Sequence, residues 1–479
     1  MNYSMVKYTL GWILLFESIF FAVPLITAIV YWEAAFFAFL ASMAICLGLG
    51  LLLTHKKPTD STIYAKEGFV IVSLCWVVLS LFGTLPFMLT GVTNYSFIDA
   101  LFETVSGFTT TGASIFTSVE WLPRSILMWR SFTHWVGGMG VLVFVMAFLP
   151  LGGGQNLHIM RAESPGPEVS KLVPRVKNTA IILYVIYFVM TFIAFISLLI
   201  ADMPVFDALN TAFSTAGTGG FGYKDDSFAS TTAAQQIIVT VFMLLFSVNF
   251  NSYYLILKLK FKDAINSEVR AFVFIVVAAI TLITANVYTE FSSLGEAIRH
   301  VAFSVASVIS TTGFSTVDFA LWPAFALTVM VIVMFIGACA GSTGGGIKVS
   351  RIIILFKGLG RELGAIVHPK QVKKISIDDH PVDREVVRSV NAYIVCYVLI
   401  FAASLMAISF DNKDLITNFT AVLATVNNVG PGLAEVGPAS NFAGFSWFSK
   451  LVLSFDMLAG RLELFPMLIL FTPSTWKKA

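Results

Sequence analysis

Long apolar runs separated by short polar segments make up most of the chain. A helix needs about 20 apolar residues to cross the hydrocarbon core of a membrane, and ten runs reach that length. We therefore expect ten membrane-spanning helices, at residues 8–31, 34–53, 68–89, 125–151, 179–200, 233–257, 271–288, 322–356, 390–410 and 448–471. The glycine-rich segment Gly341-Ser342-Thr343-Gly344-Gly345-Gly346 should break the helix within 322–356.

Four shorter semi-apolar stretches, near residues 97–108, 205–216, 297–310 and 415–426, are too short to cross a membrane. Each lies between two long runs and ends in a glycine-bearing turn. The last glycines of the four turns are 108, 93 and 117 residues apart. This pattern predicts a unit of helix, re-entrant pore helix, turn and helix that occurs four times. The turns are Thr110-Thr111-Gly112, Thr218-Gly219-Gly220, Thr311-Thr312-Gly313 and Asn428-Val429-Gly430.

The fold class expected from this pattern is an all-α polytopic membrane protein, with four helix–pore-loop–helix repeats around one ion pore. The pattern also divides the chain into segments. We expect two extra N-terminal helices at 1–66, repeats at 67–160, 161–262 and 263–360, a cytoplasmic linker at 361–387 and a fourth repeat at 388–479. The third repeat contains the broken inner helix, with its loop at 337–347.

The four turns have the composition of a cation site. Non-helical backbone at membrane depth is tolerated only where it lines water or is buried in protein, so four such turns should meet on one path. Extended turns can replace the hydration shell of an ion with carbonyl oxygens, and the threonines that begin three of the turns can add hydroxyl oxygens. The short helices point their partially negative C-terminal ends at the same path. Uncharged oxygen ligands suit a monovalent alkali ion better than Ca²⁺.

Composition and charge place the chain in lipid and orient it. Hydrophobic residues make up 57% of the chain and charged residues 12%, and the mean hydropathy is +0.84. The net charge of +2 does not suggest a nucleic-acid partner. With both termini in the cytoplasm, the cytoplasmic segments hold 23 of the 30 lysines and arginines, the outer segments hold six, and Arg461 remains within the membrane. This asymmetry predicts an inner-membrane protein with cytoplasmic termini.

Four motifs carry a resemblance to a known family: Arg161-Ala162-Glu163-Ser164-Pro165-Gly166-Pro167, Gly341–Gly346 with Lys348, Asn427-Asn428-Val429-Gly430-Pro431-Gly432 and Gly460-Arg461-Leu462-Glu463. With them, the whole chain resembles the TrkH branch of the Trk/Ktr/HKT superfamily, and the two extra N-terminal spans favour this branch over the shorter KtrB branch. The resemblance implies potassium uptake through a filter formed by the four turns. It also implies a homodimer with one pore per protomer, gated by cytosolic TrkA-like nucleotide-binding subunits.

The resemblance implies two further roles below the filter. The gate would be the loop that contains Gly337, Gly341, Ser342, Thr343, Gly344, Gly345, Gly346 and Lys348, and Arg461 would be an electrostatic barrier to cations. The residues alone also allow other interpretations. Small residues often mark close helix packing, and Arg461 could pair with Glu463.

Other functions remain open at this point. A symporter of K⁺ with H⁺ or Na⁺ would also contain broken helices. A less selective Na⁺/K⁺ pore fits the fourth turn, where Asn428 replaces threonine and Pro431 follows the glycine. A membrane-embedded enzyme would need polar catalytic groups at one depth, and none are apparent. We expect no enzymatic activity, K⁺ as the bound ion, lipid as the surroundings and no organic cofactor. The GxGxxG match at 217–222 follows a short helix rather than a strand, so it does not predict a nucleotide site.

Overall fold

The structure is a computed structural model that describes residues 1–58, 64–140, 176–368, 374–378 and 380–476. Within these residues the chain is helical except for turns, loops and one antiparallel hairpin, β1 (Ser376–Ile377) with β2 (His380–Pro381). Several expected features lie outside the described residues: the motif at 161–167, residues 141–151 of the fourth expected span, and parts of the cytoplasmic segments at 152–175 and 369–373.

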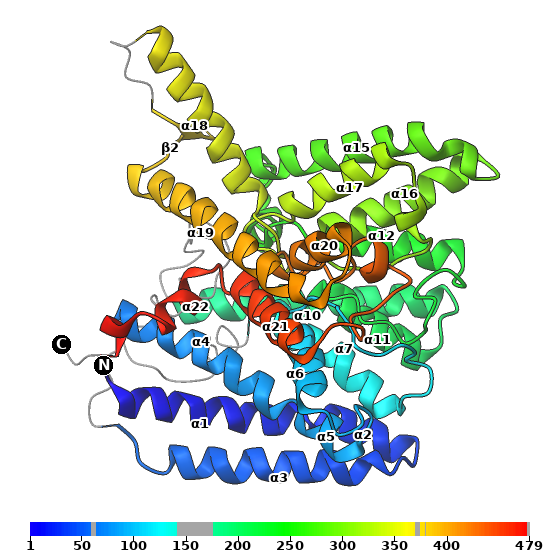
Figure 1. The fold of residues 1–479 in the computed structure, drawn as a ribbon, viewed down its shortest axis with the longest axis vertical. Helices are drawn as coiled ribbons and strands as arrows, with labels where there is room; N and C mark the ends of the chain where they lie inside the picture. The colour runs from blue at the N-terminus through cyan, green and yellow to red at the C-terminus, as the bar shows by residue number, and fades with distance from the viewer. Residues whose placement is uncertain (59–63, 141–175, 369–373, 379, 477–479) are drawn as a thin grey trace.

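The two N-terminal helices pack along each other at one side of the molecule (Figure 1). α1 (Tyr3–Phe20) continues through α2 (Ala22–Val30) as one apolar crossing, and α3 (Ala35–Thr54) returns. Two glycines permit the close approach, because a Cβ placed on Gly50 would lie 3.0 Å from the carbonyl oxygen of Gly11. In lipid, no hydrophobic force drives two apolar helices together. Small residues let the backbones approach closely, so that van der Waals packing holds the helices together.

Each of the four repeats contains an outer helix, a short helix and an inner helix. The first repeat has α4 (Ala65–Phe82), α5 (Leu85–Thr90), α6 (Phe97–Phe108) and α7 (Arg124–Gly138). The second has α10 (Val176–Ile200), α11 (Val205–Gly217), α12 (Ala233–Phe246), α13 (Phe250–Leu257) and α14 (Phe261–Ala264). The third has α15 (Ser267–Val287), α16 (Leu294–Ile309), α17 (Ala324–Ile336) and α18 (Val349–Val367). The fourth has α19 (Arg384–Ile408), α20 (Leu415–Val426), α21 (Trp447–Arg461) and α22 (Phe465–Leu470). Short 3-10 turns lie at Tyr288–Glu290, Phe319–Leu321, Ser409–Asp411, Ala434–Val436 and Pro473–Thr475.

The short helices α6, α11, α16 and α20 lie at the four stretches that the sequence marks as too short to cross. Three of them begin at a capping side chain: Ser96, Ser293 and Asp414 each accept a backbone N–H of the first turn. Such caps satisfy amide groups that have no partner within a helix. Hydrogen bonds from Thr417 also hold the pKa of the Asp414 carboxyl below its usual range.

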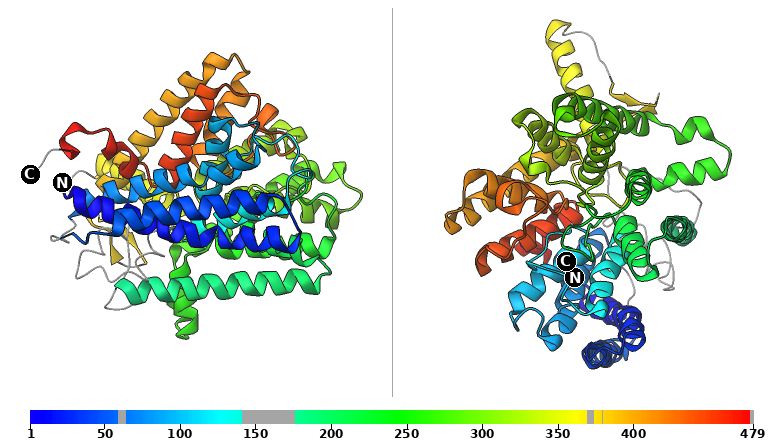
Figure 2. Two further views of the ribbon diagram at one scale, coloured as in Figure 1. Left: turned by 90° about the horizontal axis from the view of Figure 1, so that it is seen from below. Right: turned by 90° about the vertical axis from the view of Figure 1, so that its right-hand side faces the viewer.

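The repeats follow one another around a common centre, as the end-on view in Figure 2 shows. Inter-repeat packing closes the circle: α11 packs on α7, α12 on α16, α17 on α20, and α21 on α6. The two termini meet at one end of the molecule, where the Tyr3 hydroxyl donates to the Trp476 carbonyl oxygen at 2.9 Å (Figure 1). Both termini therefore lie on the same side.

The inner helices are more broken than the sequence predicts. The expected span at 233–257 is bent by 92° between α12 and α13. The expected span at 448–471 is interrupted after Arg461, where Glu463 and Leu464 have positive φ values of 61° and 65°. The expectation of one continuous helix is wrong in both places. Six described helices are long and apolar enough to cross a membrane, or seven with the bent pair, so the count of ten crossings stays a prediction.

Candidate functional site

The four predicted turns share one backbone conformation. The residue two positions before the last glycine has a positive φ in every turn, at 55°, 54°, 60° and 55° for Thr110, Thr218, Thr311 and Asn428. The last glycine has φ of 82°, 81°, 86° and 95° for Gly112, Gly220, Gly313 and Gly430. Positive φ is uncommon for residues other than glycine, so its recurrence at equivalent positions makes the turns copies of one structure.

The turns also close on one another in chain order. A Cβ on any last glycine would strike the carbonyl oxygen that precedes the last glycine of the next turn. The distances would be 2.0 Å from Gly112 to Gly219, 1.8 Å from Gly220 to Thr312, 2.5 Å from Gly313 to Val429 and 2.5 Å from Gly430 to Thr111. Real Cβ atoms do not approach so closely. The structure therefore brings all four turns into one closed ring, which we call the turn ring, and glycine is required at its four contacts.

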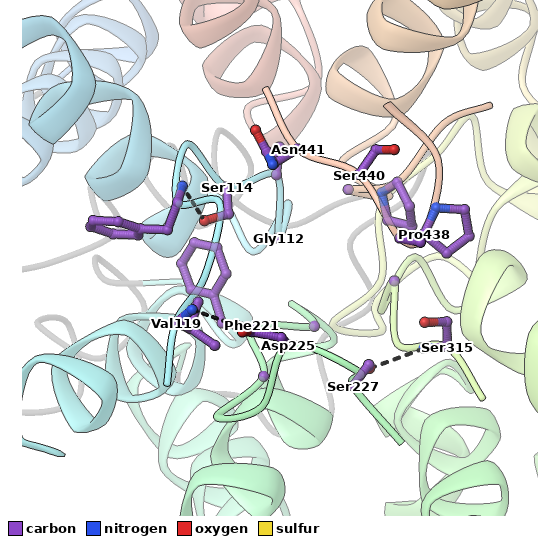
Figure 3. A pocket seen from close by; sticks show the side chains of 18 of the residues that line it. Gly112, Ser114, Val119, Phe221, Asp225, Ser227, Ser315, Pro438, Ser440 and Asn441 are labelled. Atoms are coloured by element: carbon purple, nitrogen blue, oxygen red, sulfur yellow. Dashed lines mark hydrogen bonds between the residues drawn. The ribbon is translucent and has the colours of Figure 1, made fainter. Parts of the chain in front are cut away.

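A vestibule of about 140 Å³ adjoins the turn ring and is lined by all four last glycines (Figure 3). Bonds between repeats fix its walls. The Asp225 carboxylate accepts the Val119 N–H at 2.6 Å, the Phe228 N–H donates to the Ser315 carbonyl oxygen at 2.9 Å, and the Phe442 N–H donates to the Ser114 carbonyl oxygen at 2.8 Å. These contacts join repeats one and two, two and three, and four and one.

The polar side chains that begin the turns are not equivalent. Thr110 is fully buried, and its hydroxyl has no hydrogen-bond partner among the described residues. Thr218 donates to the Gly217 carbonyl oxygen at 2.6 Å. The Asn428 side-chain amide nitrogen donates to the Thr111 hydroxyl oxygen at 3.0 Å and to the Met457 carbonyl oxygen at 2.9 Å. The three threonine hydroxyls therefore differ in their hydrogen bonds among the described residues. Each hydroxyl oxygen still has a lone pair that can face an ion, so the expectation of threonine ligands stays a prediction.

A buried ion pair behind the first turn was not found from the sequence. Arg130 and Glu103 are 2% and 0% exposed, and their Nε and Oε1 atoms are 2.8 Å apart. Glu103 also accepts the Ile115 N–H at 2.9 Å, and Arg130 donates to the Gly222 carbonyl oxygen at 3.1 Å. The pair connects the first and second turns. The six charges assigned to the outer segments include Arg130, and this assignment is wrong because helix α7 carries Arg130 into the protein.

Loss of one partner of this pair should be costly. We expect Arg130→Met to lower the free energy of unfolding by about 3–5 kcal/mol, because Glu103 would be left buried without its counter-charge. Denaturant unfolding of the purified protein in detergent measures the loss. The control is Arg124→Met, which removes an exposed arginine from the same helix and should cost about 1 kcal/mol or less. Equal stability of the two variants would contradict the role assigned to the pair.

The segment between α17 and α18 passes directly beneath the turn ring. The Gly345 N–H donates to the Thr311 hydroxyl oxygen at 2.6 Å. A Cβ on Gly345 would lie 2.3 Å from the Asn427 carbonyl oxygen. A Cβ on Gly344 would lie 2.8 Å from the Ser310 carbonyl oxygen. The glycines of this loop therefore bring its backbone into contact with the inner side of the third and fourth turns.

The same loop is bonded to the bend between α12 and α13 of the second repeat. The Cys339 N–H donates to the Ser247 carbonyl oxygen at 3.1 Å, and the Phe250 N–H donates to the Gly341 carbonyl oxygen at 3.0 Å. Lys348 is the last residue of the loop. It is buried, with φ of 83°, and its ammonium group donates back to the Gly344 carbonyl oxygen. Gly337 begins the loop, with φ of 70°.

Arg461 joins this loop to the first repeat. Its guanidinium donates to the Thr343 carbonyl oxygen at 2.8 Å and to the carbonyl oxygens of Gly137 and Gly138 at 2.6 Å each. A cavity of about 70 Å³ lies here, lined by Arg461 and several loop residues. Glu463, which the sequence offered as a partner for Arg461, forms an ion pair with Arg351 of α18.

The fold and the site together define a polytopic helical membrane protein in which four turns of one conformation meet. Comparison with known proteins gives the family. A family model described as "TrkH: Cation transport protein" matches residues 34–478. The chain is 36% identical to the Trk system potassium uptake protein TrkH of Salmonella typhimurium, over 100% of both chains. It is 32% identical to the Trk system potassium uptake protein TrkG of Escherichia coli, over 98% of both chains.

A solved structure indicates the same family. The crystal structure of the potassium transporter TrkH from Vibrio parahaemolyticus superposes with a TM-score of 0.90 at 33% identity, covering 100% of both chains. The chain therefore belongs to the TrkH family of cation transport proteins. The resemblance drawn from its motifs is confirmed, and this membership excludes the alternative of a membrane-embedded enzyme.

Proposed function

We propose that the chain takes up potassium across the inner membrane through a channel-like pore whose selectivity filter is the turn ring. The closed contact of four copies of one turn carries this proposal, because it brings a backbone carbonyl oxygen of each turn against the glycine of its neighbour in one ring. Such oxygens can replace the water around a K⁺ ion. The Trk system potassium uptake proteins that the chain resembles support K⁺ as the ion.

The filter residues in this proposal are those of the four predicted turns, with backbone oxygens as the main ligands. The unbonded hydroxyl of Thr110 is available as an additional ligand. The turns contain no carboxylate, so the site has no fixed negative charge that would favour a divalent ion. Asn428 stands where the other three turns have threonine, and its side chain donates a hydrogen bond to Thr111 of the first turn. This asymmetry favours weaker discrimination between K⁺ and Na⁺ than in a ring of four identical turns.

The loop at 337–348 is the gate in this proposal, since it lies against the inner side of the turn ring. Arg461 is the barrier, because its positive charge stands in the cavity below. Repulsion of a cation is strong where few waters screen it. We further propose cytoplasmic termini, a homodimer with one pore per protomer, and gating by cytosolic nucleotide-binding subunits of the TrkA kind.

Uptake of ⁸⁶Rb⁺ into proteoliposomes loaded with KCl tests the function, with external K⁺, Na⁺ or Li⁺ as competitor. Competition by K⁺ at much lower concentration than by Na⁺ is the expected result. Equal competition by both ions would favour the less selective pore. Uptake that requires a proton or sodium gradient would contradict a channel-like pore and favour a symporter.

A further inference from the structure

A buried carboxylate on α15 contacts the gate loop and the helix that follows it. Glu268 is 7% exposed, and its Oε1 atom accepts the Ala340 N–H at 2.7 Å and the Ser350 N–H at 3.0 Å. Ala340 belongs to the loop, and Ser350 belongs to the first turn of α18. One oxygen atom therefore bridges the loop. A negative group is favoured at the N-terminus of a helix, and the two amide groups would otherwise be costly to bury.

The cytoplasmic hairpin β1–β2 reaches the same place. A cavity of about 280 Å³ is lined by Glu268 and Ala340 on the gate side and by Asp378 and His380 of the hairpin. Asp378 accepts the N–H and the hydroxyl of Ser267 at 2.8 and 2.5 Å. Asp378 also pairs with Arg270 at 3.3 Å. Because Ser267 directly precedes Glu268, the hairpin is bonded to the turn of α15 that carries the carboxylate.

We propose that Glu268 is the positioning residue that holds the gate loop closed, and that the hairpin controls this hold through Asp378. The inference rests on the proposed function, since it takes the loop at 337–348 to be the gate. The loop is bonded to the turn ring above and to the α12–α13 bend beside it. Arg461 bonds the loop through Thr343, and Glu268 adds a further anchor from α15. A displacement of the hairpin would move the first turn of α15 and loosen both bonds from Glu268.

Flux through the chain reconstituted alone tests the hold. We expect Glu268→Ala to raise ⁸⁶Rb⁺ uptake roughly tenfold or more, because a charge-assisted acceptor for two buried amides is lost. Glu268→Gln should raise it less, since the amide oxygen can still accept. Asp378→Asn should give an intermediate increase. The matched control is Glu290→Gln, which changes an exposed carboxylate just beyond the opposite end of α15 and should leave uptake unchanged.

A native cysteine supplies a second measurement. Cys339 lies in the loop and is fully buried, as is Cys75 on α4, far from the loop in sequence. In two backgrounds that retain only one of these cysteines, we expect Glu268→Ala to raise the rate of maleimide labelling at Cys339 roughly tenfold and to leave Cys75 unchanged. A similar increase at both sites would mean general loosening of the fold and would overturn the proposal.

A loop deletion separates the inference from the function on which it rests. Removal of Gly344 and Gly345 takes away the backbone beneath the turn ring and should allow K⁺-competed ⁸⁶Rb⁺ uptake. If this variant conducts, while Glu268→Ala shows wild-type uptake and wild-type labelling of Cys339, then Glu268 does not hold the gate and the proposed function stands. If neither the wild type nor the deletion variant takes up ⁸⁶Rb⁺ in competition with K⁺, the proposed function fails, and the inference fails with it.

Discussion

Replacement of Gly220 by alanine should reduce ⁸⁶Rb⁺ uptake roughly tenfold to a hundredfold, the cost of strain forced into one turn of the ring. The added Cβ would lie 1.8 Å from the carbonyl oxygen of Thr312, and the backbone of the two turns must move apart to relieve this clash. The φ of +81° at Gly220 is also unfavourable for any residue with a side chain. Both effects displace oxygens of the turn ring, so binding of the ion should be lost while the rest of the fold persists.

The chain provides a matched control two residues away. A Cβ on Gly222 would meet nothing nearer than 3.4 Å, and its φ is not in the left-handed region. Gly222→Ala should therefore keep uptake within about twofold of the wild type, as expected for a substitution that causes no strain. If both variants conduct normally, the close contact between turns does not shape the ion path. If both are inactive, the loss reflects sensitivity of the segment and not the geometry of the ring.

Replacement of Arg461 by alanine should have a large effect in the opposite direction. The variant removes a positive charge below the turn ring and three hydrogen bonds that tie the loop to α7. We expect ⁸⁶Rb⁺ uptake to increase roughly tenfold or more, since a bond to a charged donor contributes about 1.5–3 kcal/mol. Uptake by the chain alone, before any regulatory subunit is added, is the measurement. Unchanged uptake in a variant that remains folded in detergent would contradict the role of Arg461.

A lysine at the same position separates charge from bonding. Arg461→Lys keeps the charge, but its single ammonium group lacks the planar fork that reaches three carbonyl oxygens. If repulsion alone limits flux, this variant should match the wild type. We expect an intermediate value, because both the repulsion and the bonds contribute. Arg388→Ala, which removes an exposed arginine from α19, serves as the control and should not alter uptake.

Much of the repeat could be predicted from the sequence because its signals are local. Hydropathy finds the long runs, and the shared spacing of a short helix and a glycine turn finds α6, α11, α16 and α20. The bends in the inner helices leave no comparable signal. Their local marks are single residues that a hydropathy average conceals: Pro466 lies in the first turn of α22, and Asn249 caps α13. Hydropathy reports whether a segment prefers lipid, not whether it is straight.

The buried pair of Arg130 and Glu103 shows a second limit. Counting charges by loop assumes that charges outside the apolar cores face water, and Arg130 lies near the beginning of a predicted span. One signal was available, because Glu103 is an acidic residue within a stretch placed at membrane depth, and such residues are seldom unpaired. Its partner could not be read from the sequence, since the contact depends on how α6 packs against α7. Glu268 was missed for the same reason.

The four turns share one backbone conformation but differ in sequence, so each turn can change independently of the other three. In a channel assembled from four identical subunits, any change in the filter appears four times around the axis. Here the ring belongs to a single chain, so one substitution alters one quadrant and leaves three. An asparagine in place of threonine, such as Asn428 at the start of the fourth turn, therefore changes only one of the four turns. With the turn ring as the proposed filter, ion selectivity can change one turn at a time, through intermediate rings that a channel of four identical subunits cannot form.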